Sequence, residues 1–293
     1  MIRSKLYIMN GYMEMEVFNV SSKKKIGRQR KVTETRPAQR KLNDKNSRKY
    51  FARLVNTNFV RADLSVDLTY DNENLPETRK EVYRDVRNYL NKLKRARTRE
   101  GLPPLKYIYV ISNCDQYGNE TRWHVHMFIN KMNRDVVEEK WGKGYVNAAR
   151  LQPTETGLTG KAMYVARQKK GERSWGASTN LKKPEAIVSD HKISKSQLEH
   201  MATRPDDRQF IEKLINTKKR EWIFTDCIIE RDGRQIVMDG LMPEAFNNGI
   251  SLMIRARSSN GIQLQTNKGK TISGILHQSR NKEPAMDAGT FGY

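Results

Sequence analysis

The chain contains near its middle the segment Trp123-His124-Val125-His126-Met127-Phe128-Ile129-Asn130, a run of β-forming residues that predicts a strand. Successive side chains of a strand alternate between the two faces of a sheet. His124 and His126 are therefore expected on one face, and Val125 on the other. Two neutral imidazoles side by side supply half of a metal site. This segment predicts a sheet that carries a pair of metal ligands on one face.

Patterns on both sides of this strand predict an α+β fold. Residues 62–70 alternate strictly between apolar and polar side chains, as in a half-buried strand. Two further strands are predicted over residues 105–112 and 145–151. Helical spacing of apolar residues predicts helices over 77–97, 134–141 and 155–169. The order β-α-β-β-α-β-α, with short connections, predicts a ferredoxin-like or RRM-like antiparallel sheet with its helices on one face.

We expect four parts along the chain. Residues 1–58 predict a basic N-terminal arm, with a hairpin turning at Asn10-Gly11 and a helix over 35–55. Residues 59–184 hold the predicted sheet. Residues 185–257 predict a small C-terminal α/β region, in which Pro205 interrupts a helix and Asp232-Gly233 turns a hairpin. Residues 258–293 are polar, and we expect them to be disordered.

The formal net charge of the 293 residues is +22, which indicates a polyanionic partner, most commonly nucleic acid. A protein of the membrane surface would need an apolar anchor or a basic helix with an apolar face, and the sequence shows neither. The two cysteines stand far apart and outside any CxxC motif, which favours a reducing compartment. No signal peptide follows Met1 and no apolar run could cross a bilayer, so we expect a cytoplasmic protein.

Basic side chains cluster in two stretches that we predict to contact nucleic-acid phosphates. A basic arm taken alone is usually solvated, so this prediction depends on the net charge of the whole chain. The predicted contacts are Lys23, Lys24, Lys25, Arg28, Arg30 and Lys31 in the arm, and Lys170, Arg173, Lys182 and Lys183 further on.

Tyr164 lies one β-α unit after the histidine strand, on a helix that could hold it over the histidine face. The chain has twelve tyrosines, so the case for Tyr164 rests on this position. Arg167 follows on the same side of the helix, where it could support the phenolate or contact a phosphate, and Lys169 adds positive potential. Mg²⁺ or Mn²⁺, held by the two histidines and an oxygen ligand, would polarise a phosphodiester that the tyrosine oxygen attacks.

In their order along the chain, these motifs resemble the HUH endonucleases, where U is a hydrophobic residue. They are most similar to the single-tyrosine initiators of rolling-circle replication from bacterial phages, plasmids and integrative elements. The resemblance covers about residues 1–184. It is carried by Leu68-Thr69-Tyr70, Tyr107-Ile108-Tyr109-Val110, His124-Val125-His126, Trp141-Gly142-Lys143-Gly144, Tyr164 and Asn180-Leu181-Lys182-Lys183-Pro184.

The resemblance implies an enzyme that nicks single-stranded or extruded origin DNA. Tyr164 would form a covalent 5′-phosphotyrosine, and His124 and His126 would bind the metal. The resemblance also implies origin DNA, a host helicase and a host polymerase as partners, and no membrane.

Two positions depart from the family pattern. The family has a lysine three or four residues after the tyrosine, where this chain has Arg167 and Gln168, with Lys169 one residue further on. The family's third metal ligand, an acid on the preceding strand, would fall near Ser112-Asn113, and neither of these residues is acidic. The residues that could replace it are Asp115, Gln116, Glu120 and Asp67.

Two other functions fit the same residues. A single-strand transposase or a mobilisation relaxase would share the fold and the chemistry but act on other DNA. A non-catalytic protein could instead hold single-stranded nucleic acid on a sheet with basic and aromatic surfaces. Dependence of nicking on Mn²⁺ and on the two histidines separates this binder from the enzymes.

Overall fold

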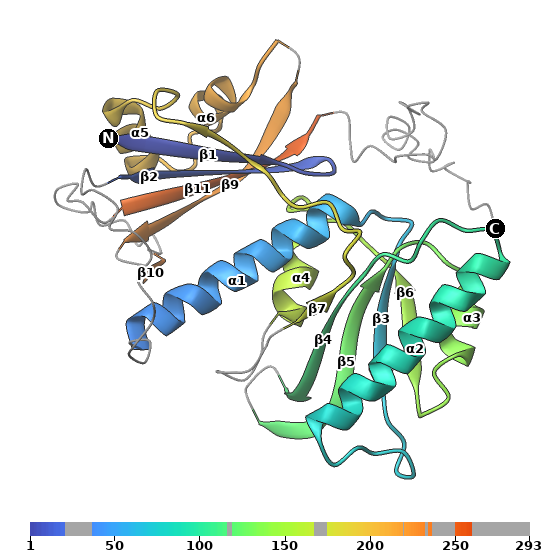
Figure 1. Ribbon diagram of the computed structural model, residues 1–293. Coiled ribbons are helices and arrows are strands. Elements are labelled where there is room, and N and C mark those ends of the chain that lie inside the picture. Colours follow the sequence, from blue (N-terminus) through green and yellow to red (C-terminus); the bar gives the residue numbers. More distant parts are fainter. Residues whose placement is uncertain are drawn as a thin grey trace, which may run out of the picture.

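The computed structural model describes residues 1–20, 37–115, 119–166, 175–218, 220–231, 234–235 and 250–259. This part of the chain is an α+β structure with two antiparallel sheets and six helices (Figure 1). None of these helices has both the length and the apolar composition needed to span a bilayer.

The histidine strand lies at the centre of a five-stranded sheet with the order β6-β3-β5-β4-β7. The bounds are β3 (Leu64–Thr69), β4 (Tyr107–Cys114), β5 (Glu120–Ile129), β6 (Val146–Arg150) and β7 (Gly176–Ala177). The register places Asp67 of β3 opposite His126 and Ser112 of β4 opposite His124. The four strands predicted in this part of the chain are confirmed.

Helices cover both faces of this sheet (Figure 1). The helices α2 (Arg79–Arg99) and α3 (Arg134–Glu139) pack on the face that holds Val125. The helices α1 (Pro37–Asn58) and α4 (Thr159–Val165) pack on the histidine face, against Phe128. The prediction that the helices of this unit share one face is right for α2 and α3 but wrong for α4, and α1, which was assigned to the N-terminal arm, covers the same face as α4. Because β4 and β5 carry apolar side chains on both faces, helices must pack on each face to bury these side chains.

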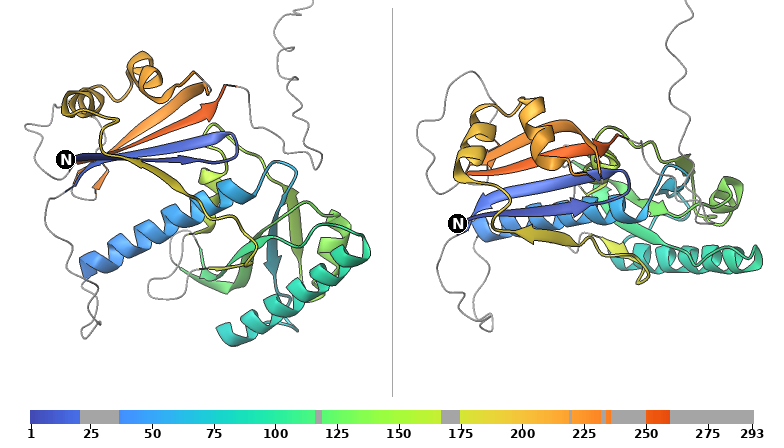
Figure 2. Two further views of the ribbon diagram at one scale, coloured as in Figure 1. Left: turned by 45° about the horizontal axis from the view of Figure 1, so that its top comes forward. Right: turned by 90° about the horizontal axis from the view of Figure 1, so that it is seen from above.

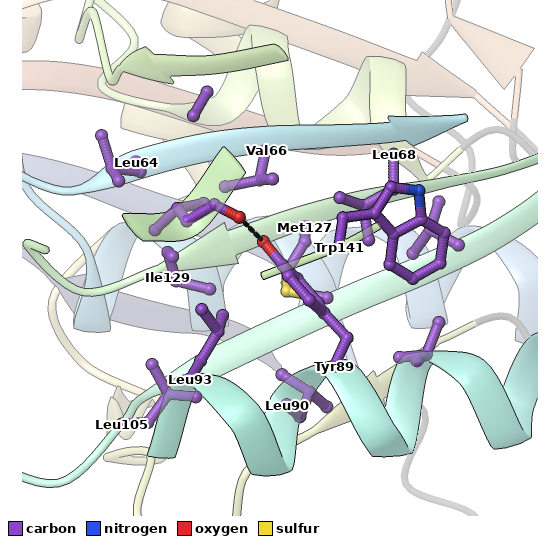
Figure 3. Packing of buried hydrophobic residues seen from close by; sticks show 14 of the residues in the cluster. Leu64, Val66, Leu68, Tyr89, Leu90, Leu93, Leu105, Met127, Ile129 and Trp141 are labelled. Carbon is purple, nitrogen blue, oxygen red and sulfur yellow. Dashed lines mark hydrogen bonds between the residues drawn. The ribbon is translucent and has the colours of Figure 1, made fainter. Parts of the chain in front are cut away.

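The core under α2 fixes how this helix lies on the sheet (Figure 3). Tyr89 of α2 is buried and donates a hydrogen bond to the Val137 carbonyl oxygen of α3, at 2.8 Å. The Trp141 ring packs edge-on against Tyr89, and its indole nitrogen donates to the Thr69 carbonyl oxygen at 2.8 Å. The Tyr89 hydroxyl and the Trp141 indole nitrogen thus both have partners, so these two rings add apolar area to the core without leaving their own polar atoms unpaired.

The second sheet has six strands in the order β10-β9-β11-β2-β1-β8. Their bounds are β1 (Ile2–Ile8), β2 (Tyr12–Asn19), β8 (Ala186–Ser189), β9 (Trp222–Arg231), β10 (Arg234–Gln235) and β11 (Ile250–Ser258). The hairpin predicted at Asn10-Gly11 is confirmed, and β2 also pairs with β11 of the C-terminal region. The N-terminal hairpin thus shares one sheet with the C-terminal strands, a long-range pairing that the sequence analysis did not anticipate.

Two short helices, α5 (Lys195–Thr203) and α6 (Arg208–Ile215), cover one face of the six-stranded sheet. Pro205 lies between them, as predicted. They pack against Met13, Met15 and Val17 of β2. This second core therefore draws on both ends of the chain.

Helix α1 lies between the two sheets (Figures 1 and 2). Its apolar side, with Phe51 and Val55, packs on the five-stranded sheet. Its basic side meets acidic residues of β2: the Arg53 guanidinium is 2.7 Å from Glu14, and the Lys49 ammonium is 3.0 Å from Glu16. The predicted helix over residues 35–55 is confirmed, and it joins the two halves of the molecule.

Gly144 allows a close approach of two backbone segments next to the site strands. Its φ is +140°, and a Cβ built there would lie 2.5 Å from the Asp71 nitrogen and 2.6 Å from the Thr69 oxygen. Because these neighbours are backbone atoms, they cannot rotate away. We expect Gly144→Ala to lower the free energy of unfolding by at least about 2 kcal/mol, measured by denaturant titration.

Gly142→Ala is the matched control for this substitution. Gly142 has a φ of +63°, but no atom lies within 4 Å of its built Cβ. The control should therefore show only the smaller cost of left-handed backbone, about 1 kcal/mol. Equal losses for the two variants would contradict the close approach at Gly144.

Candidate functional site

The two histidines of β5 lie side by side on the sheet face that α1 and α4 cover. Their ring centroids are 5.0 Å apart, while Val125 between them is buried in the opposite core. The predicted alternation is therefore confirmed. It follows from the two-residue period of a strand alone.

Hydrogen bonds fix the tautomer of both rings. The His126 Nδ1 lies 2.6 Å from the Asp67 Oδ1, and the His124 Nδ1 lies 2.9 Å from the Arg122 carbonyl oxygen. A carboxylate and a carbonyl oxygen can only accept, so each Nδ1 carries the hydrogen. In a neutral ring of this tautomer Nε2 carries the lone pair, which is the form in which histidine binds a metal.

Burial and neighbouring charges shift the pKa values of His124 and Asp67. Burial lowers the pKa of His124, so its ring is neutral at pH 7. Burial would raise the pKa of the Asp67 carboxyl, but the hydrogen bond from His126 and the Lys161 ammonium bring it below its usual value. Asp67 is therefore a carboxylate that holds the His126 ring in place.

Tyr164 lies beside the histidines. Its ring centroid is 6.1 Å from that of His126, and 48% of the residue is exposed. Asn56 of α1 anchors the start of α4: its Oδ1 accepts from the Leu158 nitrogen at 2.7 Å, and its Nδ2 donates to the Thr159 hydroxyl at 3.0 Å. Helix α4 is shorter than the predicted helix over residues 155–169, but it holds the tyrosine over the predicted face.

Lys161 is a residue of this site that the sequence analysis missed. Its ammonium lies 3.9 Å from the Asp67 Oδ2 and 5.8 Å from the centroid of the Tyr164 ring. Lys161 precedes Tyr164 by three residues, so it lies on the same side of the helix. The three-residue spacing between Lys161 and Tyr164 is the sequence signal for this contact.

The histidines and the tyrosine line one cleft of about 500 Å³. A cation and an aromatic side chain from the same strand, Arg122 and Trp123, also line it. The remaining lining residues are Thr69, Tyr70, Ser112, Cys114, Asp115, Thr121 and Val165. This cleft is large enough to hold a phosphodiester with part of a nucleotide.

The described residues narrow the choice of a third metal ligand. Asp67 is engaged with His126, and Glu120 accepts from the Asn113 amide outside the cleft lining. Asp115 lines the cleft, and its carboxylate accepts from the backbone and side-chain nitrogens of Asn119. Gln116 lies outside the described residues. Within the described ranges, no three His, Cys, Asp or Glu side chains form a group that could hold an ion.

No protein-family model, curated protein or solved structure matches the chain. The arrangement of Tyr164 and the two histidines in the cleft is therefore the basis for proposing a function. Two imidazole nitrogens could bind a divalent cation whose remaining ligands would be water or a phosphate oxygen.

Most of the predicted basic contacts fall outside the described residues. They are Lys23, Lys24, Lys25, Arg28, Arg30, Lys31, Arg167, Lys169, Lys170 and Arg173. Lys182 and Lys183 are described and exposed, on the segment between β7 and β8. The backbone nitrogen of Lys182 donates to the Asn58 Oδ1 at 2.7 Å, so this segment is tied to the end of α1. Neither lysine lines the cleft.

Proposed function

We propose that the chain is an HUH-type single-tyrosine endonuclease that nicks single-stranded or extruded origin DNA and later rejoins the strand. The observation that carries this proposal is one cleft lined by Tyr164 and by two histidines whose Nδ1 atoms are both held by hydrogen bonds, which leaves their Nε2 atoms as the nitrogens that could bind a metal. In such a cleft a phosphodiester can lie between a nucleophile and a cation.

The proposed reaction transfers a phosphoryl group to the tyrosine. The Tyr164 oxygen forms a bond to phosphorus while the bond from phosphorus to the 3′-oxygen breaks. The phenolic proton passes to solvent, and the departing oxygen takes up a proton to become a 3′-hydroxyl. The product is a 5′-phosphotyrosine, which keeps the bond energy, so a 3′-hydroxyl can reverse the step without ATP. A bound Mg²⁺ or Mn²⁺ would supply Lewis-acid polarisation of the phosphate.

The other side chains of the site position these groups. Asp67 orients His126, and Lys161 supplies positive charge next to Tyr164 and Asp67. Lys161 stands before the tyrosine, whereas the family's lysine follows it. We further propose that Arg167 and Lys169 add positive potential beyond α4, and that the basic arm over residues 21–36 contacts phosphates.

The fold is compatible with this proposal. The order β6-β3-β5-β4 within the five-stranded sheet is compatible with the ferredoxin-like or RRM-like sheet that we propose for this part of the chain. We propose that the enzyme starts rolling-circle replication of a phage, plasmid or other mobile element. A host helicase and polymerase would then act on the exposed 3′-hydroxyl.

A nicking assay tests the proposal directly. The substrates are labelled single-stranded oligonucleotides that tile the DNA around the gene of this protein, incubated with the full chain and Mn²⁺. We expect one oligonucleotide to yield a shorter labelled product and a protein–DNA adduct that survives denaturation, and EDTA to prevent both. Nicking without an adduct, or an adduct that forms in EDTA, would contradict the proposal.

One observation favours a second candidate, a non-catalytic protein that binds single-stranded nucleic acid. The described residues offer no complete group of three metal ligands, and Trp123 and Tyr164 in the cleft could stack bases. Such a protein would bind the same oligonucleotides with and without Mn²⁺ and would never become attached to them.

Asp67→Asn tests the positioning of His126. Asparagine keeps the shape of the side chain, but its amide can present a donor to His126 Nδ1, so the tautomer is no longer enforced. We expect metal affinity or nicking to fall by about 10- to 100-fold, measured as the Mn²⁺ concentration that gives half-maximal rate. Glu120→Gln is the control, since Glu120 lies outside the cleft lining, and it should act like the unchanged chain. Equal rates for Asp67→Asn and the control would remove Asp67 from this role.

A further inference from the structure

Helix α2 exposes a row of basic side chains along its length. Five of them form no ion pair with any described residue: Lys80, Arg84, Arg87, Arg95 and Arg99. Two others have local partners, because Lys92 donates to the Lys140 carbonyl oxygen and Lys94 lies over the Tyr107 ring. Arg97, a further basic residue of α2, is buried and donates to the carbonyl oxygens of Pro103 and Lys131.

The five basic residues lie on one side of helix α2. At 100° per residue they fall within about 120° of the helix circumference, opposite the buried stripe that contains Val82, Val86 and Leu93. From Lys80 to Arg99 the row is about 28 Å long at 1.5 Å per residue. Duplex DNA of that length carries about 16 phosphates on its two strands. The row therefore has the length and sign of charge to follow a duplex backbone.

Within the described residues, no acidic side chain forms an ion pair with this row, and Glu100 beside Arg99 offsets one charge at its end. Asp85 is buried in α2 and pairs with Lys143 at 3.4 Å, and Glu81 is used in the N-terminal capping box. On the neighbouring helix α3, Glu138 pairs with Arg134 within the helix, and Glu139 pairs with Lys140 just after it. Like charges at this spacing along one helix repel each other, so a polyanion that lies along them is bound favourably.

We propose that the exposed face of α2 binds the phosphate backbone of duplex DNA. Proteins that hold single strands use aromatic side chains as stacking platforms, and the exposed positions of α2 carry none. Helix α2 lies on the face of the sheet opposite the Tyr164 cleft (Figure 1), so the two surfaces hold different DNA segments. This binding goes beyond the proposed cleavage and does not require it.

The experiment measures affinity of the full chain for a 20-base-pair duplex of random sequence from 50 to 300 mM NaCl, by fluorescence anisotropy. The test variant is Arg84→Gln/Arg87→Gln/Arg95→Gln/Arg99→Gln. We expect its salt slope to fall by about 3 to 4, because each phosphate contact contributes about 0.9, and its affinity at 100 mM NaCl to fall at least about 10-fold. The four residues are exposed, so the fold should survive, as circular dichroism would verify.

Two controls make the result specific. The variant with lysine at the same four positions keeps the charge and should bind the duplex almost normally. A charge-matched variant on the other half of the molecule, Lys195→Gln/Arg204→Gln/Arg208→Gln/Lys213→Gln, should change the salt slope by less than one. If it weakens binding as much as the α2 variant, or if the α2 variant binds like the unchanged chain, α2 is not the surface.

Failure of the proposed cleavage can be recognised separately. Nicking of a short single-stranded oligonucleotide should proceed at the same rate in the α2 variant and the unchanged chain. A chain that never nicks, but whose duplex affinity still depends on α2, would refute the endonuclease and leave this surface established.

Discussion

The variant Tyr164→Phe should form no covalent adduct with single-stranded DNA. Phenylalanine lacks the oxygen that would attack phosphorus, and no other group of the site can replace it in the same position. We expect the nicking rate to fall by about 10⁴-fold or more, as occurs when a nucleophile is removed. Denaturing gel electrophoresis of labelled oligonucleotides measures both the adduct and the shortened product.

DNA binding should change little in this variant, because the aromatic ring remains available to stack and Tyr164 is only half-buried. Tyr145→Phe is the matched control: Tyr145 is 74% exposed and does not line the cleft. It should nick at the normal rate. An adduct that persists in Tyr164→Phe would show that the nucleophile lies elsewhere, and peptide mapping of the adduct would locate it.

The second large effect is expected for the double substitution His124→Ala/His126→Ala. It removes both Nε2 atoms from the cleft, so a divalent cation would lose its protein anchors and the phosphate its polarisation. We expect a loss of about 10³-fold or more in Mn²⁺-dependent nicking. The rise in melting temperature on adding Mn²⁺ should disappear with it, which measures binding without catalysis.

His200→Ala is the control for the histidine pair. His200 lies on α5, where its Nε2 is 2.8 Å from the Asp207 carboxylate, and it is remote in the fold from the cleft. This variant should keep the Mn²⁺ response. If the double variant also keeps it and still nicks, the metal is bound without the histidines and the proposed reaction fails.

Local periodicity made much of this site predictable. The two-residue period of β5 put both histidines on one face, and the helical pattern put Tyr164 on a segment that follows them. The role of Asp67 was not predictable, since it depends on the register between β3 and β5, which no local pattern records. Asp67 was considered only as a metal ligand, and the structure instead places it behind His126.

The limits of the fold prediction have a similar cause. The alternation in residues 62–70 and the helical stripe of α2 identified elements correctly, because each depends on neighbours in the sequence. The pairing of β2 with β11 joins residues more than 200 positions apart, and sequence patterns contain no signal for it. The sequence predicted helix α1 correctly, but it did not show which face of the five-stranded sheet the apolar side of α1 covers.

The six-stranded sheet has a consequence for how the chain is made. The β1–β2 hairpin is synthesised early, whereas β9 begins about 200 residues after β2 ends. At the usual rate of translation, β9 is synthesised on the order of 10 to 40 s after the hairpin. During that time the apolar side chains of Met13, Met15 and Val17 are exposed to solvent. A truncated chain that ends near residue 184 would keep the Tyr164 cleft, but the apolar face of β2 would stay exposed to solvent permanently. We therefore expect nascent and shortened chains to depend on chaperones, while the completed protein does not.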